Sequence, residues 1–551
     1  MIQTFIRRAM PVLAMTLLLT EAAQAQTQQR RAGRPKIVVG MMVDQMRWDF
    51  LYRYAERYGD GGFKRLLREG FRCEQTYINY APTVTACGHT SVYTGSVPAV
   101  HGIMDNDWFS REKGRGVYCT EDSSVMPVGI SATKGGMSPR NMLTTTVTDE
   151  LRMATNYESK VVGVALKDRG SILPAGHAAN AAFWYDGGSG NWITSTYYMQ
   201  ELPGWAKQYN AARRPQALLA KGWETLYPIS TYHLSEADDK NYENTFKHEQ
   251  APVFPHSFTG MESGSIRSTP FGNTLTFEFA KAAIEGYGLG SGKATDFLAV
   301  SFSSPDAVGH QFGPNSIETE DVYLRLDKDL ADFFGYLDGR FGKGNWLYFI
   351  TADHGVSHSP GYLEEHRLPT GTLDGKGVIA SLNTDLEKIY GVKNAIMATA
   401  ADQLYLDRPA FAAKNADMKA VSDFIIRRLR EVPEIADAVW LPEIGTAGLH
   451  EPLQTMLQNG YNRKRGGDII IIMNSGVKNG SRKGATHGLW YPYDAHIPLV
   501  WMGWGINSGG RSFRTMGMTD IAPTVAALLN IQVPSGNIGH VIGEAIRADK
   551  P

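Results

Sequence analysis

Short apolar runs that each end in a polar residue recur along this chain of 551 residues. KIVVGMMVD ends at Asp44, DFLAVSFSSPD ends at Asp306, and NWLYFITADH ends at Asp353 and His354. The runs VVGVALKDR, GDIIIIMNSG and HIPLVWMGWG have the same character. Because these runs are continuously apolar rather than alternating, they are typical of strands buried on both faces, as in a parallel sheet.

Helical patterns lie between these runs. In TEDVYLRLDKDLADFFGYLDG, apolar side chains recur at helical spacing. Near the C-terminus, MTDIAPTVAALLNI places Asp520 and Pro523 at a helix start, and an apolar stripe follows them. The alternation of strands and helices predicts an α/β architecture.

The length of the chain exceeds what one simple core usually holds, so we expect either one large domain with a sizeable insertion or two domains. Turns rich in Gly and Pro break up residues 170–290, where aromatic side chains are also frequent, which indicates long loops decorating the sheet. Residues 357–480 contain an amphipathic helix, MKAVSDFIIRRLREV, and short strands such as QLYLD, so we predict an inserted α/β cap subdomain there. The predicted core comprises residues 26–356 and 481–551.

The first 25 residues have the pattern of a secretory signal peptide. Arg7 and Arg8 precede the apolar run AMPVLAMTLLLT, and Ala23-Gln24-Ala25 forms a cleavage pattern. A membrane anchor is the alternative, but the run is short for a bilayer. We therefore predict a periplasmic or secreted protein with no stable membrane insertion. The formal net charge of −1 gives no reason to expect nucleic acid as a specific partner.

Three cysteines remain after removal of the signal peptide: Cys73, Cys87 and Cys119. An oxidising compartment permits one disulfide among them. We expect a Cys73–Cys119 bond, because Cys87 falls in a stretch predicted to lie buried near the site.

Asp44, Asp306 and Asp353 each stand at the carboxyl end of a predicted strand, where open α/β sheets place their functional crevice. Three carboxylates at one edge repel one another unless cations hold them. One aspartate at a strand end is usually a turn former, but three, with histidines nearby, favour a metal site.

Three histidines extend this set of acids. His310 follows Asp306 by four residues, His354 is adjacent to Asp353, and His487 lies in GATHGLW between two predicted strands. Mixed imidazole and carboxylate ligands suit zinc or a similar transition metal. Because the ligands are too many for one tetrahedral ion, we expect two Zn²⁺ ions per chain.

The stretch YAPTVTACGHT offers two nucleophiles, Thr85 and Cys87. A metal ion activates a threonine hydroxyl by direct coordination, and ACGHTSVYTG after Thr85 is suited to begin a helix whose N-terminus favours phosphate. The alternative is a thiol site made by Cys87 and His89, but side chains two apart on a helix do not face each other. We expect Thr83 to be structural and Cys87 and His89 to pack the helix.

An ordered set of motifs carries a family resemblance: VDQMRWD, APTVTACGHTSVYTGSVPAVHGI, NDWF, LKDRGSILPAGH, SFSSPDAVGHQFGP, TADHG and THG. From about residue 36 to the C-terminus, the chain resembles the alkaline phosphatase superfamily. It is most similar to the phosphate-irrepressible alkaline phosphatases (the PafA type), which are related to nucleotide pyrophosphatase/phosphodiesterases. The resemblance implies a three-layer sandwich, with a mostly parallel central sheet, helices on both faces, inserted loops and a small subdomain.

The resemblance also implies a role for each motif residue. It implies that Thr85 is the nucleophile, which forms a covalent phosphothreonine. It assigns Asp44, Asp353 and His354 to the zinc that activates Thr85, and Asp306, His310 and His487 to the second zinc. Asn106 resembles an asparagine that donates to a phosphoryl oxygen. Lys167 and Arg169 resemble the pair that marks phosphate monoesterases.

The charges of the substrates support the role of that cationic pair. A monoester dianion presents more negative charge than a diester, so Lys167 and Arg169 favour the monoester. Lying two apart on an extended run, both can face one side. We therefore predict a monomeric alkaline phosphatase that hydrolyses small-molecule phosphate monoesters with broad specificity.

Three other functions compete with this one. A phosphodiesterase or nucleotide pyrophosphatase would use the same metals and threonine. A sulfatase would need Cys-x-Pro/Ala-x-Arg, whereas GHTS follows Cys87. A secreted binding protein with a degenerate site would lack some of the metal ligands, whereas this sequence has a suitable residue at every expected ligand position.

Overall fold

The structure is a computed structural model, and it describes residues 33–132 and 135–548. The predicted signal peptide, residues 1–25, lies outside the described residues. Within these two ranges, no helix is both long and apolar enough to cross a membrane.

Five parallel strands form the centre of an eleven-stranded sheet. In spatial order they are β10 (Trp346–Thr351), β1 (Ile37–Val43), β9 (Asp296–Phe302), β6 (Val161–Ala165) and β7 (Ala181–Asp186). All residues of β1, β6, β9 and β10 are buried, which explains why their sequences are continuously apolar. The predicted parallel centre of the sheet is confirmed.

The flanks of this sheet are mostly antiparallel. β18 (Leu499–Gly503) pairs antiparallel with β10 and with β2 (Phe71–Tyr77), which also pairs with β17 (His496–Ile497) and β19 (Arg511–Gly517). At the other edge, β8 (Asn191–Ser195) and β5 (Pro127–Val128) are antiparallel. The parallel reading of HIPLVWMGWG is therefore wrong, because burial on both faces makes a run apolar whichever way the strand points.

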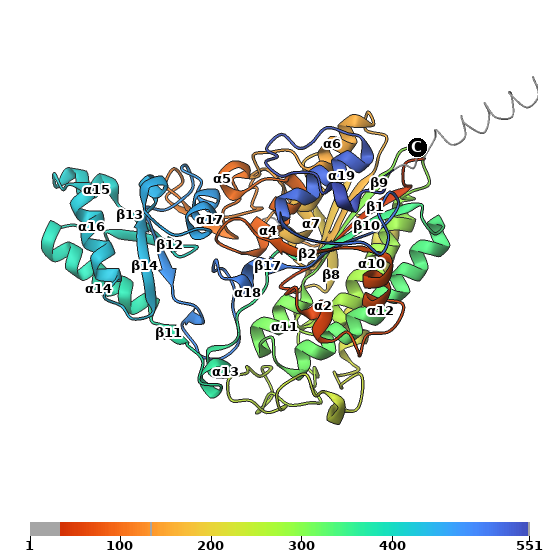
Figure 1. Ribbon diagram of the computed structural model, residues 1–551, viewed down its shortest axis with the longest axis horizontal. Helices are drawn as coiled ribbons and strands as arrows, with labels where there is room; N and C mark the ends of the chain where they lie inside the picture. Colours follow the sequence, from red (N-terminus) through yellow and green to blue (C-terminus); the bar gives the residue numbers. More distant parts are fainter. Residues whose placement is uncertain (1–32, 133–134, 549–551) are drawn as a thin grey trace, which may run out of the picture. The chain divides into compact units, whose positions relative to one another are not determined.

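Helices cover both faces of the large sheet, as expected (Figure 1). The long helices α10 (Phe271–Tyr287) and α12 (Ile317–Phe341) pack together over one face. The shorter helices α4 (Thr85–Thr94), α7 (Asp168–Ala175) and α19 (Ile521–Leu529) pack on the other. The predicted helices over α12 and α19 are confirmed, and the side chain of Ser316 caps α12 by accepting from the Thr319 amide.

The prediction of loops over residues 170–290 is partly wrong. That stretch contains β7 and β8 of the large sheet and all of α10. The loops lie mainly between β8 and α10, around α8 (Gly204–Ala211) and α9 (Arg214–Leu219). The strands were hidden because each has only five or six residues and β8 has a polar beginning.

A second sheet of four strands lies within the predicted cap. It consists of β12 (Ile396–Ala400), β13 (Gln403–Leu406), β15 (Ile469–Met473) and β14 (Ile435–Trp440). α14 (Gly375–Tyr390) and α16 (Met418–Leu429) pack against it and share a separate apolar cluster that includes Leu386 and Ile425 (Figure 1). The run IIIIM is thus β15 of this sheet, not a strand of the large one. The division of the chain at 357 and 480 stays a prediction.

The remaining elements connect these layers. They are α2 (Phe50–Arg53), α3 (Phe63–Glu69), α5 (Pro98–His101), β3 (Asp107–Ser110), β4 (Arg115–Tyr118), α6 (Val147–Ala154), α11 (Ser304–Phe312), α13 (Pro360–Glu365), β11 (Gly371–Leu373), α15 (Arg408–Ala413), α17 (Leu453–Gly460), β16 (Val477–Asn479), α18 (Pro492–Ala495) and five short 3₁₀ turns.

Candidate active site

The register of the central strands brings the three predicted aspartates to one edge of the sheet. Met42 pairs with Thr351, so Asp44 and Asp353 each lie two residues beyond a matched pair. Val43 pairs with Phe302, and α11, which begins directly after β9, carries Asp306 in its first turn. All three side chains are buried, with exposures of 0%, 0% and 5% for Asp44, Asp353 and Asp306.

One group of side chains surrounds the start of α4. His354 Nε2 lies 3.4 Å from Asp44 Oδ1 and 3.4 Å from Asp353 Oδ2. Neither of these buried carboxylate oxygens has a hydrogen-bond partner in the described part of the chain. Thr85, the first residue of α4, places its Oγ1 3.5 Å from the same imidazole nitrogen. Two unsatisfied oxygens and one nitrogen therefore converge beside the predicted nucleophile.

A second group lies on α11 and on the loop that carries His487. His310 Nε2 is 3.1 Å from Asp306 Oδ1, and His487 Nε2 is 3.6 Å from the same oxygen. These are the three residues of the predicted second set, and their ligand atoms lie within 4.8 Å of one another. Asp306 also lies within ligand distance of Asp44 and His354, so it is shared by two groups that could hold a metal ion.

The three histidines share one orientation. Nδ1 of each contacts a backbone carbonyl: His310 contacts Ala485 O at 2.9 Å, His354 contacts Gly355 O at 3.0 Å, and His487 contacts Thr83 O at 2.8 Å. A carbonyl oxygen only accepts, so the proton is on Nδ1 and the lone pair is on Nε2. All three Nε2 lone pairs thus face the carboxylates, which is how metal-binding histidines are held.

Lys167 lies between the two groups. Its Nζ is 2.5 Å from Asp44 Oδ2 and 2.6 Å from Asp306 Oδ2. β6 ends at Ala165 and α7 begins at Asp168, so the prediction of one extended run through Lys167 and Arg169 is wrong. The chain turns there because an aspartate in the first turn stabilises a helix N-terminus.

Arg169 reaches the site from the first turn of α7. Its Nη1 donates to the Tyr118 hydroxyl at 3.1 Å, and that hydroxyl donates to Asp168 Oδ1 at 2.5 Å. Asn106 precedes β3, and its Oδ1 accepts from the Ala86 amide at 3.0 Å. The predicted phosphate-binding residues are thus tied to α4, α7 and the β3–β4 hairpin.

Burial and neighbouring charges shift the pKa values of the buried carboxylates in opposite directions. Burial raises the pKa of Asp44 well above its ordinary value, and the nearby charges of Asp306 and Asp353 raise it further. Burial alone would also raise the pKa of Asp306, but Lys167 and His310 bring that pKa well below its ordinary value. A cluster of this kind needs positive charge, which suits divalent cations.

Two further residues contact the carboxylates, although nothing in the sequence predicted that they would. Gln45 has a left-handed backbone (φ 69°), and it donates from its amide N to Asp353 and from Nε2 to Asp306, at 3.1 and 2.8 Å. His89, expected only to pack α4, hydrogen-bonds the Thr85 carbonyl through Nδ1 at 2.8 Å and the Ser301 hydroxyl through Nε2 at 2.7 Å, and its Nδ1 lies 3.3 Å from Asp353 Oδ2. No sequence pattern marks the approach to Asp306, Asp353 and Ser301, because these residues are hundreds of positions away.

The cysteines are free and buried. Cys87 donates to the carbonyl of Ile103, and burial raises its pKa well above the ordinary value, which argues against a thiolate nucleophile. The expected Cys73–Cys119 disulfide is wrong, since both thiols are free. Cys73 packs in the main core and Cys119 in a separate apolar cluster with Trp108.

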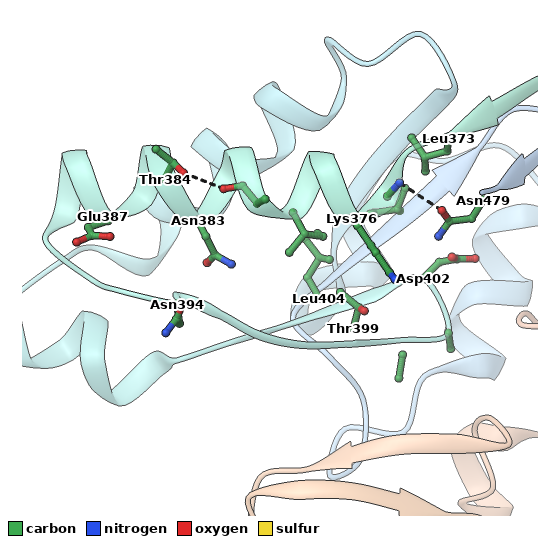
Figure 2. A pocket seen from close by; sticks show the side chains of 16 residues that line it. Leu373, Lys376, Asn383, Thr384, Glu387, Asn394, Thr399, Asp402, Leu404 and Asn479 are labelled. Atoms are coloured by element: carbon green, nitrogen blue, oxygen red, sulfur yellow. Dashed lines mark hydrogen bonds between the residues drawn. The ribbon is translucent and has the colours of Figure 1, made fainter. Parts of the chain in front are cut away.

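A hollow of about 800 Å³ in the predicted cap is lined by none of the predicted catalytic or metal-binding residues (Figure 2). Its walls come from α14 and the β12–β13 hairpin, with Asn383, Thr384 and Asp402 among the lining side chains. The chemistry is therefore concentrated at the edge of the large sheet.

Comparison with known proteins gives a consistent result. A sequence model of the type I phosphodiesterase / nucleotide pyrophosphatase family matches residues 38–494. The alkaline phosphatase PafA of Elizabethkingia meningoseptica is 50% identical over 519 residues, which cover 93% of this chain and 95% of PafA. The alkaline phosphatase PhoV of Synechococcus elongatus is 48% identical over 550 residues, covering 97% and 99% of the two chains.

A solved structure extends this likeness to the fold. The crystal structure of wild-type PafA superimposes with a TM-score of 0.91 at 49% identity, covering 94% of this chain and 100% of that one. The chain belongs to the type I phosphodiesterase / nucleotide pyrophosphatase family, on the PafA branch of the alkaline phosphatase superfamily.

Proposed function

We propose that this chain is a secreted, two-zinc alkaline phosphatase that hydrolyses phosphate monoesters through a covalent phosphothreonine on Thr85. Its reaction class is that of a phosphoric monoester hydrolase, in line with relatives that are 50% and 48% identical. The observation that carries the proposal is the convergence of three Nε2 lone pairs on three buried carboxylates beside Thr85. We further propose a monomer with broad specificity for small phosphate monoesters.

The donor set fits two metal ions. Asp44, Asp353 and His354 would hold one ion, and the second set, which comprises Asp306, His310 and His487, would hold the other. In the first set, Asp44 Oδ1 and Asp353 Oδ2 have no hydrogen-bond partner in the described part of the chain, and the imidazoles of both sets have a fixed tautomer, which suits zinc ligation. When bound, the two ions supply Lewis acidity that lowers the pKa of a coordinated hydroxyl and neutralises charge on the leaving oxygen.

In the proposed reaction, Thr85 attacks the phosphorus atom. Its Oγ1 forms a bond to phosphorus as the ester oxygen departs, and the departing alcohol takes up a proton. Attack by water then breaks the Thr85–phosphate bond, releases inorganic phosphate and restores the hydroxyl. Since Thr85 begins α4, the helix dipole favours the negative charge of the phosphoryl group.

Three side chains would bind the non-bridging oxygens. The amide oxygen of Asn106 already accepts from the Ala86 amide, so its Nδ2 is the donor it offers to substrate. Lys167 and Arg169 bring two positive charges, and Tyr118 and Asp168 orient the guanidinium. Charge-assisted bonds of this kind favour a dianion.

The decisive experiment compares two neighbouring substitutions. Thr85→Ala should lower kcat for a phenyl phosphate monoester by about 10³-fold or more, because it removes the nucleophile, while the zinc content measured by mass spectrometry stays near two per chain. Cys87→Ala is the matched control and should retain most activity. Loss of activity in Cys87→Ala with survival in Thr85→Ala would overturn the assignment, and a metal-free active wild type would overturn the zinc proposal.

A further inference from the structure

Two adjoining hollows of about 740 and 280 Å³ lie along the loop that joins α17 to β15. Arg111, Tyr461, Arg463 and Lys464 line both, so the hollows form one continuous groove. One wall is the β3–β4 hairpin and the other is the loop sequence NRKRGG at 462–467. We call it the basic groove, after the six cations in its lining: Arg111, Lys113, Arg408, Arg463, Lys464 and Arg465.

Positive charge exceeds negative charge in the basic groove, although Lys113 pairs with Glu121 at 3.6 Å. Glu112 is the acidic residue among its lining side chains. Buried Asp468 pairs with both Arg111 and Arg408, at 2.6 and 2.5 Å, so one negative charge is shared by two guanidinium groups. The whole chain has a formal net charge of −1, so this concentration of cations is local rather than a property of the composition.

Two of the cations are available to a ligand. Arg463 and Lys464 are exposed, and their side chains make no hydrogen bond or ion pair within the described ranges. Arg465 is different, because it donates to the carbonyls of Gly102 and Asn141 and is held in the wall. Free, adjacent cations on a fixed backbone are suited to oxygens of phosphate groups.

The aromatic residues of the basic groove do not offer stacking surfaces. Trp108 is 3% exposed, and the guanidinium of Arg465 lies over its ring at 5.0 Å. Tyr461 is 9% exposed. Single-stranded nucleic acid usually binds by stacking bases on exposed aromatic rings, which this groove lacks. A concave groove also fits a chain better than a flat membrane surface.

We propose that the basic groove binds linear inorganic polyphosphate, at a site separate from Thr85. A linear polyphosphate repeats one negative charge at every phosphate, so it can contact several cations of a groove at once, whereas a single phosphate can contact only one or two. None of the predicted catalytic or metal-binding residues lines the groove. The proposal is therefore independent of the phosphothreonine mechanism.

Calorimetric titration with a polyphosphate fraction of defined chain length tests this proposal. The zinc-loaded wild type should bind polyphosphate, and Arg463→Ala/Lys464→Ala should bind it about tenfold or more weakly. The plot of log affinity against log salt concentration should also be less steep for this variant, because about one to two fewer ions are released on binding. Lys293→Ala/Arg547→Ala, which removes two exposed cations outside the groove, is the charge-matched control and should bind like the wild type. kcat/KM for a small monoester should be equal in all three proteins.

Four outcomes would overturn the proposal. The first is equal affinity in wild type and Arg463→Ala/Lys464→Ala. The second is loss of binding when orthophosphate saturates the Thr85 centre at matched ionic strength, which would place the ligand there. The third and fourth are tighter binding of a charge-matched single-stranded oligonucleotide, or of anionic phospholipid vesicles, than of polyphosphate.

Discussion

Lys167 is the residue on which the charge balance of the site depends. It contacts Asp44 and Asp306 directly, whereas Arg169 is held by Tyr118 at the start of α7. The two cations therefore act from different supports, although they are two apart in sequence. Under the proposed function, both cations would face a substrate whose charge differs by about one unit between a monoester and a diester.

Removing these cations should lower activity toward a monoester far more than activity toward a diester. In Lys167→Ala/Arg169→Ala, kcat/KM for a phenyl phosphate monoester should fall by about 10²-fold or more, because two charge-assisted contacts to the dianion are lost. kcat/KM for the matching diester should fall much less. Steady-state kinetics with both substrates checks this, and Lys293→Ala is a control outside the site. A wild type that strongly prefers the diester would instead favour the phosphodiesterase function.

The geometry of the candidate active site depends on how closely helix α4 approaches the end of strand β10. Gly88, in the first turns of α4, faces the backbone of Asp353 so closely that an added Cβ would lie 2.5 Å from Asp353 Cβ and 2.6 Å from its Cα. Real atoms do not pack at such distances. The helix that presents Thr85 can therefore pack this closely against Asp353 only because residue 88 has no side chain.

Gly88→Ala should therefore separate α4 from β10. We expect a loss of stability of roughly 1–3 kcal/mol from overpacking, together with a large fall in kcat because Thr85 and Asp353 move apart. Gly335→Ala on α12 is the matched control, because nothing lies within 4 Å of its added Cβ, and it should stabilise the protein by up to about 1 kcal/mol. Denaturant unfolding and kinetics measure both effects. Normal kcat in Gly88→Ala would contradict this account.

Much of this arrangement could be predicted from the sequence, and part of it could not. The strands β1, β9 and β10, which lead toward Asp44, Asp306 and Asp353, were predictable, because burial on both faces leaves a continuous apolar run and parallel strands align their carboxyl ends. The sequence prediction that Asp306 itself stands at a strand end was wrong, because β9 ends at Phe302 and Asp306 lies in α11. The antiparallel direction of β18 was not, since burial carries no information on direction. The contacts of Gln45 with Asp306 and Asp353 were not either, because they depend on tertiary packing alone.

Away from the candidate active site, a second buried acidic network should affect how the stability of the folded protein depends on pH. Glu243 and Glu318 are 2% and 1% exposed, and Oε2 of Glu243 has no hydrogen-bond partner in the described part of the chain. Burial, and then the charges of Glu318 and Asp238, raise the pKa of Glu243 from 4.5 to about 10. The folded protein therefore keeps a proton on Glu243 that the unfolded chain has lost at neutral pH.

This difference fixes the sign of the effect. Between about pH 4.5 and 10 the folded state binds the extra proton, so the free energy of unfolding falls as the pH rises through that window, by on the order of 1 kcal/mol per pH unit. Glu243→Gln keeps a neutral side chain of the same size and should flatten this slope, so that the variant is more stable than the wild type at pH 9. Glu224→Gln, at an exposed position, is the control and should follow the wild-type curve. Urea unfolding at pH 6, 7.5 and 9 measures how the free energy of unfolding changes with pH in the three proteins. If Glu243→Gln and the wild type show the same dependence, Glu243 is already ionised in the folded enzyme.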